Sequence, residues 1–319
     1  MQPGPPAVHP IGPRAVYPDQ SRKARASWDC LVRRDGATAR AYISATRRPP
    51  MAERDYVLGT HDDEIYRLGF QHRVWRPRAL DAWSRARIGD GCKVIDFGAG
   101  PGFATMDLAE MVGPHGEVHA LERSRRFLDT LEAQAKARGF TQVKAHEIDV
   151  MTDAIPVSGA DAAWARWIFA FLPRPKEALK KLVDALKPGG TLVFHEYIDY
   201  QTWKLAPPAP NFEKFVDEVS ANWRASGGEP DIARHLPAWL TEMGLKVESL
   251  KPYVDVVSKD DNVWRWPIGF FDIHIDRLLE LNRITPELAK DMRDEFARVS
   301  EQPGTLMVTP LVLEIIARK

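Results

Sequence analysis

From about residue 60 onward, short apolar runs alternate with amphipathic stretches. Leu179, Leu182 and Val183 recur at the i, i+3 and i+4 spacing that places side chains on one face of a helix. Residues 93–97 instead form a largely apolar run, which is typical of a strand buried on both faces of a sheet. Repeated alternation of such strands and helices predicts an α/β fold whose mostly parallel sheet is covered by helices on both faces.

The pattern also gives the order of the elements. It predicts strands at residues 93–97, 117–121, 142–147, 161–166, 191–195, 246–257 and 306–317. It predicts helices from about residue 60 and at residues 77–87, 103–112, 125–138, 179–186 and 237–243. Two long segments, residues 196–236 and 258–305, interrupt this rhythm and contain helical stretches. Connections of that length in a compact domain are usually functional, so we expect them to be caps.

The first fifty residues differ from the rest of the chain. They hold eight of the 25 prolines and nine basic residues against three acidic ones, without a helical or strand period. This composition predicts a disordered extension. Met51 opens the first patterned segment, and we hypothesise that the natural protein starts there. The predicted organisation is an extension at residues 1–50, an N-terminal helical lid at 51–90, and a main domain at 91–319 that carries both caps.

Composition and charge exclude several classes of protein. Lys+Arg and Asp+Glu both number 44, so the formal net charge is zero, and a uniformly basic nucleic-acid binder is excluded. No apolar run approaches the roughly 18 residues of a membrane span, and no secretory signal pattern follows the N-terminus. Cys30 and Cys92 are too few for a disulfide framework or a cysteine metal site. We expect a soluble, cytoplasmic protein with no metal and no nucleic-acid partner.

A glycine loop between a strand and a helix is the first chemical signal. Gly98, Gly100 and Gly102 let backbone N–H groups approach a ligand at the positive end of the next helix. A dinucleotide fingerprint needs a further glycine where Phe103 stands. Two acids sharpen the interpretation: Asp96 precedes the loop, and Glu122 ends the next strand. The first carboxylate suits an ammonium group and the second can accept two ribose hydroxyls, which points to a nucleoside that carries an amino acid.

Five segments in this order resemble the motifs of class I S-adenosylmethionine-dependent methyltransferases. They are Val-Ile-Asp-Phe-Gly-Ala-Gly-Pro-Gly at 94–102, Val-His-Ala-Leu-Glu-Arg-Ser at 118–124, Ile-Asp-Val at 148–150, Asp-Ala-Ala-Trp-Ala-Arg-Trp-Ile-Phe-Ala-Phe-Leu-Pro at 161–173 and Leu-Lys-Pro-Gly-Gly-Thr-Leu-Val-Phe-His-Glu at 186–196. The resemblance covers about residues 60–319 and is greatest to the ubiquinone/menaquinone-methyltransferase-like group of small-molecule enzymes. It implies a Rossmann-like, seven-stranded, mostly parallel sheet with a reversed last strand and helical cap insertions.

The resemblance also implies S-adenosylmethionine as cofactor and assigns residues to it. Glu122 would bind the ribose, Asp149 would lie at the adenine amino group, and Asp96 with the glycine loop would surround the methionine moiety. The full set of expected cofactor residues is Asp96, Gly98, Ala99, Gly100, Gly102, Glu122, Arg123, Asp149, Val150 and Arg166. The chain departs from the family pattern in having Glu rather than the commoner Asp at 122, and two extra residues between Asp149 and Ile155-Pro156.

Catalytic residues are harder to predict, because methyl transfer mainly needs alignment and exclusion of water. A general base is required only when the nucleophile must lose a proton. The candidates are His195 and Glu196, at the predicted carboxyl end of a strand, where open α/β sheets bind ligands, and His72 on the first helix. For each lone histidine a structural role stays open as the alternative.

The cap segments are rich in aromatic residues, which suit a flat organic acceptor. The expected acceptor residues are Tyr66, Trp75, Trp167, Tyr200, Trp203, Trp264, Phe270 and His274. We expect O-methylation of an aromatic or polyketide-like compound, with C- or N-methylation of a small molecule, or a non-catalytic cofactor-binding regulator, as alternatives. Residues 161–173 lack the Asn/Asp-Pro-Pro-aromatic sequence usual in enzymes that methylate exocyclic base nitrogens, which disfavours a nucleic-acid substrate.

Overall fold

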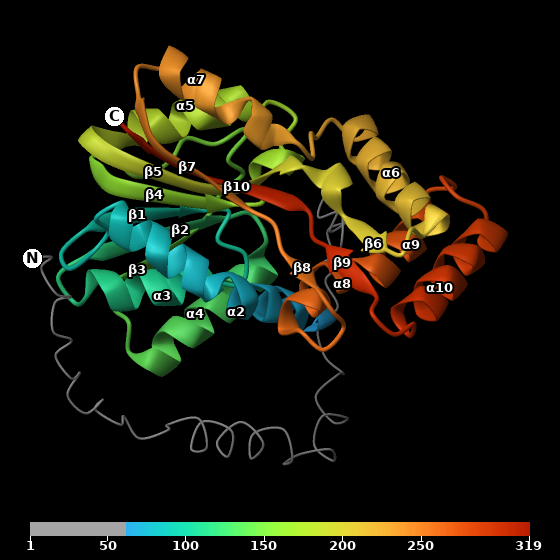
Figure 1. Ribbon diagram of the computed structural model, residues 1–319. Coiled ribbons are helices and arrows are strands. Elements are labelled where there is room, and N and C mark those ends of the chain that lie inside the picture. The colour runs from blue at the N-terminus through green and yellow to red at the C-terminus, as the bar shows by residue number, and fades with distance from the viewer. Residues whose placement is uncertain (1–61) are drawn as a thin grey trace, which may run out of the picture. The chain divides into compact units, whose positions relative to one another are not determined.

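The computed structural model describes residues 62–319, whose main feature is a seven-stranded sheet (Figure 1). Its strand order is β3-β2-β1-β4-β5-β10-β7. The strands are β1 (Lys93–Phe97), β2 (Glu117–Glu122), β3 (Val143–Glu147), β4 (Ala160–Arg166), β5 (Leu186–Asp199), β7 (Lys246–Tyr253) and β10 (Leu311–Arg318). The first five strands pair in parallel, whereas β10 is antiparallel to both β5 and β7. The predicted mostly parallel sheet with a reversed last strand is confirmed.

Helices cover both faces of this sheet (Figure 1). One face carries α2 (Asp62–Arg85), α3 (Phe103–Val112) and α4 (Arg125–Arg138), and the other carries α5 (Pro175–Ala185) and α7 (Leu236–Glu242). The predicted helices at 103–112 and 125–138 are confirmed. Ser124 Oγ accepts from Phe127 N at the start of α4, and Gly139 ends α4 in the left-handed conformation. Both ends of α4 were therefore readable from the sequence.

The prediction of two N-terminal helices that separate at Pro77 is wrong. The structure has one helix, α2, with Pro77 in its interior. A proline inside a helix removes one backbone hydrogen bond and costs about 3 kcal/mol or more. Packing outweighs that cost, because Trp75, Ala79 and Trp83 are fully buried on the side of α2 that faces the rest of the protein.

Two strands predicted as continuous, 246–257 and 306–317, are each interrupted. The first divides into β7 and β8 (Val256–Val257), and the second into β9 (Leu306–Val308) and β10. Pro310 lies in the second interruption, where it cannot donate to a strand ladder. The detached pieces join β6 (Lys204–Ala206) in a second sheet of order β6-β9-β8, which the sequence analysis did not predict.

The two long interruptions fold together into a mainly helical cap. It comprises α6 (Pro210–Ala225), α8 (Arg265–Ile268), α9 (Phe271–Glu280), α10 (Pro286–Ser300) and the second sheet, with the short 3-10 turns η2 (Tyr200–Thr202), η3 (Ile232–Arg234) and η4 (Asn262–Trp264). Thr285 caps α10 through a bond from Leu288 N to its hydroxyl, as Thr-Pro at a helix start predicts. The predicted extension at 1–50 and residues 51–61 of the predicted lid lie outside the described residues.

Candidate cofactor and acceptor site

The loop between β1 and α3 has a backbone that only glycine adopts readily. Gly98, Gly100 and Gly102 have φ values of 75°, 55° and 88°. A Cβ on Gly98 would lie 2.3 Å from Ile168 Cδ1, so the loop also approaches the segment after β4 too closely for a side chain. The N–H groups of Gly98 and Ala99 donate to Leu121 O, and that of Gly102 donates to Ala99 O. The loop thus places the positive start of α3 at the carboxyl end of β1.

Asp96 lies at that end of β1 and is only 2% exposed. Its Oδ2 accepts a hydrogen bond from the Thr105 hydroxyl at 2.6 Å. Burial raises the pKa of Asp96 to about 6, although the bond from Thr105 and the charge of Arg166 act in the opposite direction. A buried carboxylate held in this way can pair with a cationic group.

Glu122 ends the neighbouring strand, β2, and its carboxylate contacts the same loop. Its two carboxylate oxygens accept backbone N–H groups from Gly100 (3.0 Å), Arg123 (2.9 Å) and Ser124 (2.9 Å). Burial raises the pKa of Glu122, and these three bonds oppose that shift. Because β1 and β2 are parallel neighbours, both carboxylates lie at the same sheet edge, with the glycine loop between them.

Asp149 follows β3, the next strand along the same edge. Its Oδ1 accepts from Met151 N at 2.8 Å, and its own N–H donates to Asp153 Oδ2 at 2.8 Å. These bonds form a tight turn that accommodates the two extra residues before Ile155. Val150 is buried, whereas Arg123 is exposed. Asp149 therefore lies at the predicted sheet edge, within a polar turn.

Arg166, at the end of β4, joins α2 and α3 to this edge through His72. Arg166 Nη2 donates to His72 Nδ1 at 2.9 Å, and His72 Nε2 donates to Asp107 Oδ2 at 2.9 Å. Arg76 Nε also donates to Asp107 Oδ2, at 2.8 Å. Burial lowers the pKa of His72, in accord with a neutral ring that accepts at one nitrogen and donates at the other. Both nitrogens are engaged, so His72 has no free position from which to act as a base.

His195 and Glu196 do not lie at the end of their strand. The sequence predicted an end at residue 195, but β5 continues to Asp199. Both side chains are fully buried. His195 Nε2 donates to Glu314 Oε2 at 3.1 Å, and burial lowers the pKa of His195 to about 4. Glu196 Oε1 instead accepts from the backbone N–H groups of Ile168 and Phe169.

These contacts give His195 and Glu196 structural roles. His195 is fully buried, with its ring 5.5 Å from that of Trp75 and 4.9 Å from that of Trp164. Glu196 is also fully buried, and its carboxyl holds the loop after β4 through the two backbone bonds, so it is not accessible as a base. Burial raises the pKa of Glu196 to about 8. The prediction of both residues as catalytic bases is therefore corrected.

Six of the expected acceptor residues lie in one aromatic cluster between α2, the end of β4 and the cap. They are Trp75, Trp167, Tyr200, Trp203, Trp264 and Phe270. His274 borders this aromatic cluster, with its ring 5.5 Å from that of Phe270. Tyr66 is 68% exposed on α2 and does not belong to it. Tyr197 also stacks on Trp167, at 5.6 Å between ring centres.

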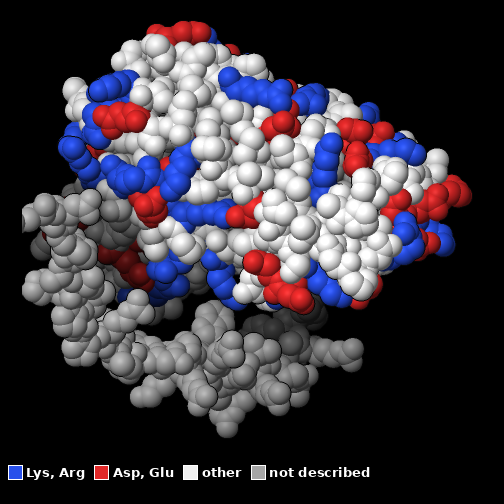
Figure 2. All heavy atoms as spheres, in the orientation of Figure 1, with Lys and Arg blue, Asp and Glu red and all other residues white. Residues whose placement is uncertain are grey.

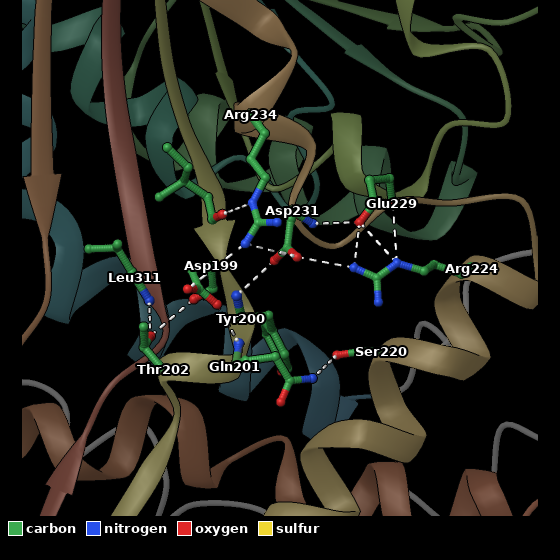
Figure 3. Close-up of polar contacts among 11 residues, drawn as sticks. Asp199, Tyr200, Gln201, Thr202, Ser220, Arg224, Glu229, Asp231, Arg234 and Leu311 are labelled. Carbon is green, nitrogen blue, oxygen red and sulfur yellow. Dashed lines mark hydrogen bonds and ion pairs between the residues drawn. The ribbon is translucent and has the colours of Figure 1, made fainter.

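A buried carboxylate fixes the entry of the chain into the cap. Figure 3 shows Asp231 between Arg224 of α6 and Arg234 of η3. Asp231 Oδ1 accepts from Tyr200 N at 2.8 Å, and Asp231 Oδ2 lies 3.0 Å from Arg224 Nη2 and 3.7 Å from Arg234 Nη2. Thr202 Oγ1 donates to the backbone and accepts from Leu311 N at 2.8 Å, which ties η2 to β10. Tyr200 thus has a fixed position in the aromatic cluster.

Known proteins share the sequence segments that form this site. The family model described as a methyltransferase domain matches residues 88–228, which hold the glycine loop and both acids. Residues 88–228 form a class I S-adenosylmethionine-dependent methyltransferase domain. A solved structure of a candidate methyltransferase from Bacillus halodurans shares the fold of this methyltransferase domain and its surroundings. The TM-score is 0.53 at 15% identity, covering 76% of this chain and 98% of that one.

Relatives of the methyltransferase domain act on different acceptors. A demethylmenaquinone methyltransferase of Anoxybacillus flavithermus is 32% identical over 39% of this chain and 51% of the relative. An aklanonic acid methyltransferase of a Streptomyces species is 25% identical over 47% of this chain and 68% of the relative. A tRNA (adenine(58)-N(1))-methyltransferase catalytic subunit of Cryptococcus neoformans is 30% identical over 39% and 28%. The chain spans about half the length of the demethylmenaquinone relatives it matches.

The structure adds polar residues that the sequence analysis missed. Thr105 and Asp107 lie on the buried face of α3, which is otherwise apolar, and they hold Asp96 and His72. A threonine and an aspartate on a buried helix face were the available signal. Within residues 62–319, no group of three or more potential ligand side chains is placed to hold a metal ion. In the same range, no helix combines the length and apolar character that a membrane crossing requires.

Proposed function

We propose that the protein is an S-adenosylmethionine-dependent methyltransferase that acts on a small organic acceptor. The observation that carries this proposal is the convergence of Asp96 and Glu122 on one glycine loop, at the carboxyl ends of two parallel neighbouring strands. A carboxylate at a helix start repels the pyrophosphate of a dinucleotide but attracts an ammonium group. The acids therefore favour the methionine-bearing cofactor over a nicotinamide cofactor.

Each proposed cofactor residue has a role that fits its position. Asp96 would receive the ammonium group, and the loop from Gly98 through Ala99, Gly100 and Gly102 would lie against the methionine moiety, with the start of α3 beside it. Glu122 would exchange its bond from Gly100 N for the ribose hydroxyls, with Arg123 beside it. Asp149 and Val150 would border the adenine. The bound cofactor would supply an electrophilic methyl group on a sulfonium.

The chain's own contribution to the reaction would be alignment and exclusion of water. The aromatic cluster lies beyond the end of β4, and its Trp167 follows Arg166 directly. Its large aromatic faces suit a flat quinone-like or polyketide-like acceptor, the substrate types named for the demethylmenaquinone and aklanonic acid relatives. We propose O-methylation as the reaction, with C- or N-methylation of the same class of acceptor as the alternative.

A nucleic-acid acceptor is less well supported, although one relative methylates tRNA. Nucleic-acid binding requires a basic surface that neutralises phosphates. On the face drawn in Figure 2, acidic side chains lie among the basic ones. We therefore propose a small-molecule partner and a location in the cytoplasm, and expect no nucleic acid in the complex.

Release of S-adenosylhomocysteine in the presence of a panel of hydroxylated naphthoquinones, anthraquinones and phenolic acids tests the proposal. Glu122→Gln should reduce the rate, because the ribose contact loses a charged acceptor. The matched control is Glu132→Gln, whose side chain is exposed on α4 and forms an ion pair with Arg125. Tight cofactor binding without turnover across the whole panel would instead support a regulatory protein.

A further inference from the structure

Arg166 is an enclosed cation without a carboxylate partner among residues 62–319. Among these residues its side chain makes one hydrogen bond, to the neutral His72 ring, and its Nη1 is buried without a partner. The guanidinium lies over the rings of Trp164 and Trp167, at 5.7 and 5.2 Å from their centres. Aromatic faces and a neutral imidazole balance a buried charge only in part.

The carboxylates near Arg166 have other partners. Asp107 is bonded to His72 and Arg76, and Asp96 is bonded to Thr105. Burial lowers the pKa of Arg166 to about 10, so it is still charged at neutral pH. Once Asp96 pairs with an ammonium group, as the proposed function requires, Arg166 has no anion of its own. A buried charge in that situation favours a ligand that carries the opposite charge.

Trp167 follows Arg166 directly and brings a further hydrogen-bond donor into the aromatic cluster. Its φ of 50° is a left-handed conformation that residues with side chains seldom adopt, and such strain concentrates at functional sites. Its indole Nε1–H is buried without a partner in residues 62–319, as are those of Trp75 and of Trp223 and Trp266, which pack in the same cluster. These groups are hydrogen-bond donors only, so they match a ligand rich in oxygen.

We propose that the acceptor is an acidic phenol or enol, bound as its oxygen anion by Arg166 Nη1 with Trp167 Nε1 beside it. This inference rests on the proposed function and names its substrate class. The acceptor would lose its proton to solvent before or during binding. Its oxygen lone pair would form the new bond to the methyl carbon, and the carbon–sulfur bond would break with its electron pair left on sulfur. The products would be a methyl ether and S-adenosylhomocysteine with a neutral sulfur, and Arg166 would stay protonated. Because the acceptor binds as an anion, the reaction would need no accessible base, and none is found among His72, His195 and Glu196.

The test compares two probes of the same shape: 2-hydroxy-1,4-naphthoquinone, an enol ionised at neutral pH, and 1,4-naphthoquinone, which has no ionisable hydroxyl. Binding of each to the full chain is measured by fluorescence quenching, with and without S-adenosylhomocysteine. The wild-type protein should prefer the hydroxylated probe by about tenfold or more, as a charge-assisted hydrogen bond implies. Arg166→Gln should lose most of this preference, Arg166→Lys should retain part of it, and the exposed Arg174→Gln should leave it unchanged.

The outcomes separate the two proposals. An equal affinity of the wild-type protein for both probes, or a full preference in Arg166→Gln, would overturn the inference. Weaker S-adenosylhomocysteine binding in Arg166→Gln with an unchanged probe preference would also overturn it, since Arg166 would then serve the cofactor carboxylate. Failure of the wild-type protein to bind S-adenosylhomocysteine would refute the proposed function, while the probe comparison without that ligand would still decide the role of Arg166.

Discussion

His274 offers a test of the cap interior that depends on pH. It is 2% exposed in α9, and its Nδ1 donates to Phe270 O at 3.0 Å. Its Nε2 is buried and has no partner in the described part of the chain. Burial lowers the pKa of His274 to about 4, the bond to Phe270 opposes this shift, and the charge of Arg67 adds to it. The folded protein therefore keeps this ring neutral under conditions in which the unfolded chain protonates it.

The size of the effect follows from the two pKa values. Between pH 6.5, the ordinary pKa of histidine, and about pH 4, the pKa of His274 in the folded protein, the unfolded chain binds a proton that the folded protein does not. His274 thus contributes stability that is fully present above pH 6.5 and is lost as the pH falls toward 4. Between pH 7 and pH 5 the loss is about 2 kcal/mol of unfolding free energy. Other buried groups titrate in the same range, so the effect must be measured as a difference.

The variant His274→Phe removes the titrating imidazole and keeps an aromatic ring at this position. Phe270 O stays satisfied because the backbone N–H of residue 274 also donates to it at 2.9 Å. Urea unfolding at pH 7 and pH 5, followed by circular dichroism, should show that the variant loses about 2 kcal/mol less than the wild-type protein over this interval. Ile275→Val, on the same helix, should cost about 1 kcal/mol equally at both pH values. Parallel pH profiles for His274→Phe and the wild-type protein would refute the assignment of a buried, neutral His274.

Two further substitutions test how the site is held in place. Glu314→Gln should destabilise the protein by about 2 kcal/mol in urea unfolding, because buried Glu314 accepts from Arg85, His195 and Tyr253. The control Asp129→Asn, at an exposed side chain, should cost at most about 1 kcal/mol of unfolding free energy. Equal losses of unfolding free energy in the two variants would contradict this account. Gly98→Ala should weaken S-adenosylhomocysteine binding because its Cβ meets Ile168, whereas Gly139→Ala, with a similar φ and nothing near its Cβ, should change only stability; identical affinities in the two variants would argue against a close approach at Gly98.

The elements that the sequence predicted well are those specified by local residues. The strand 93–97, the glycine loop and the helices on either side of 117–121 depend on caps, glycines and short apolar runs. Asp96 and Glu122 were identifiable because each stands at a fixed distance from the loop. Parallel pairing of adjacent strands then brings them to one edge without further information.

The predictions that failed depend on contacts between distant parts of the chain. Pro77 does not end α2 because buried aromatic side chains hold the helix on the sheet. The residues after 195 continue β5 because they pair with β10, which runs beside β5 as far as Asp199. The hydrogen-bond partner of His195, Glu314, lies 119 residues away in the sequence. Local patterns carry no information about such a partner, so a buried histidine resembled a catalytic one.

The central claim is that the glycine loop with Asp96 forms an S-adenosylmethionine site. Calorimetric titration of the full chain with S-adenosylmethionine, S-adenosylhomocysteine and NAD, beside Asp96→Ala, tests it directly. The account predicts micromolar binding of the first two ligands, no binding of NAD, and loss of about tenfold or more in affinity in the variant, because the ammonium group loses its buried carboxylate. Binding of NAD to the wild-type protein, or unchanged S-adenosylhomocysteine affinity in Asp96→Ala, would contradict the account.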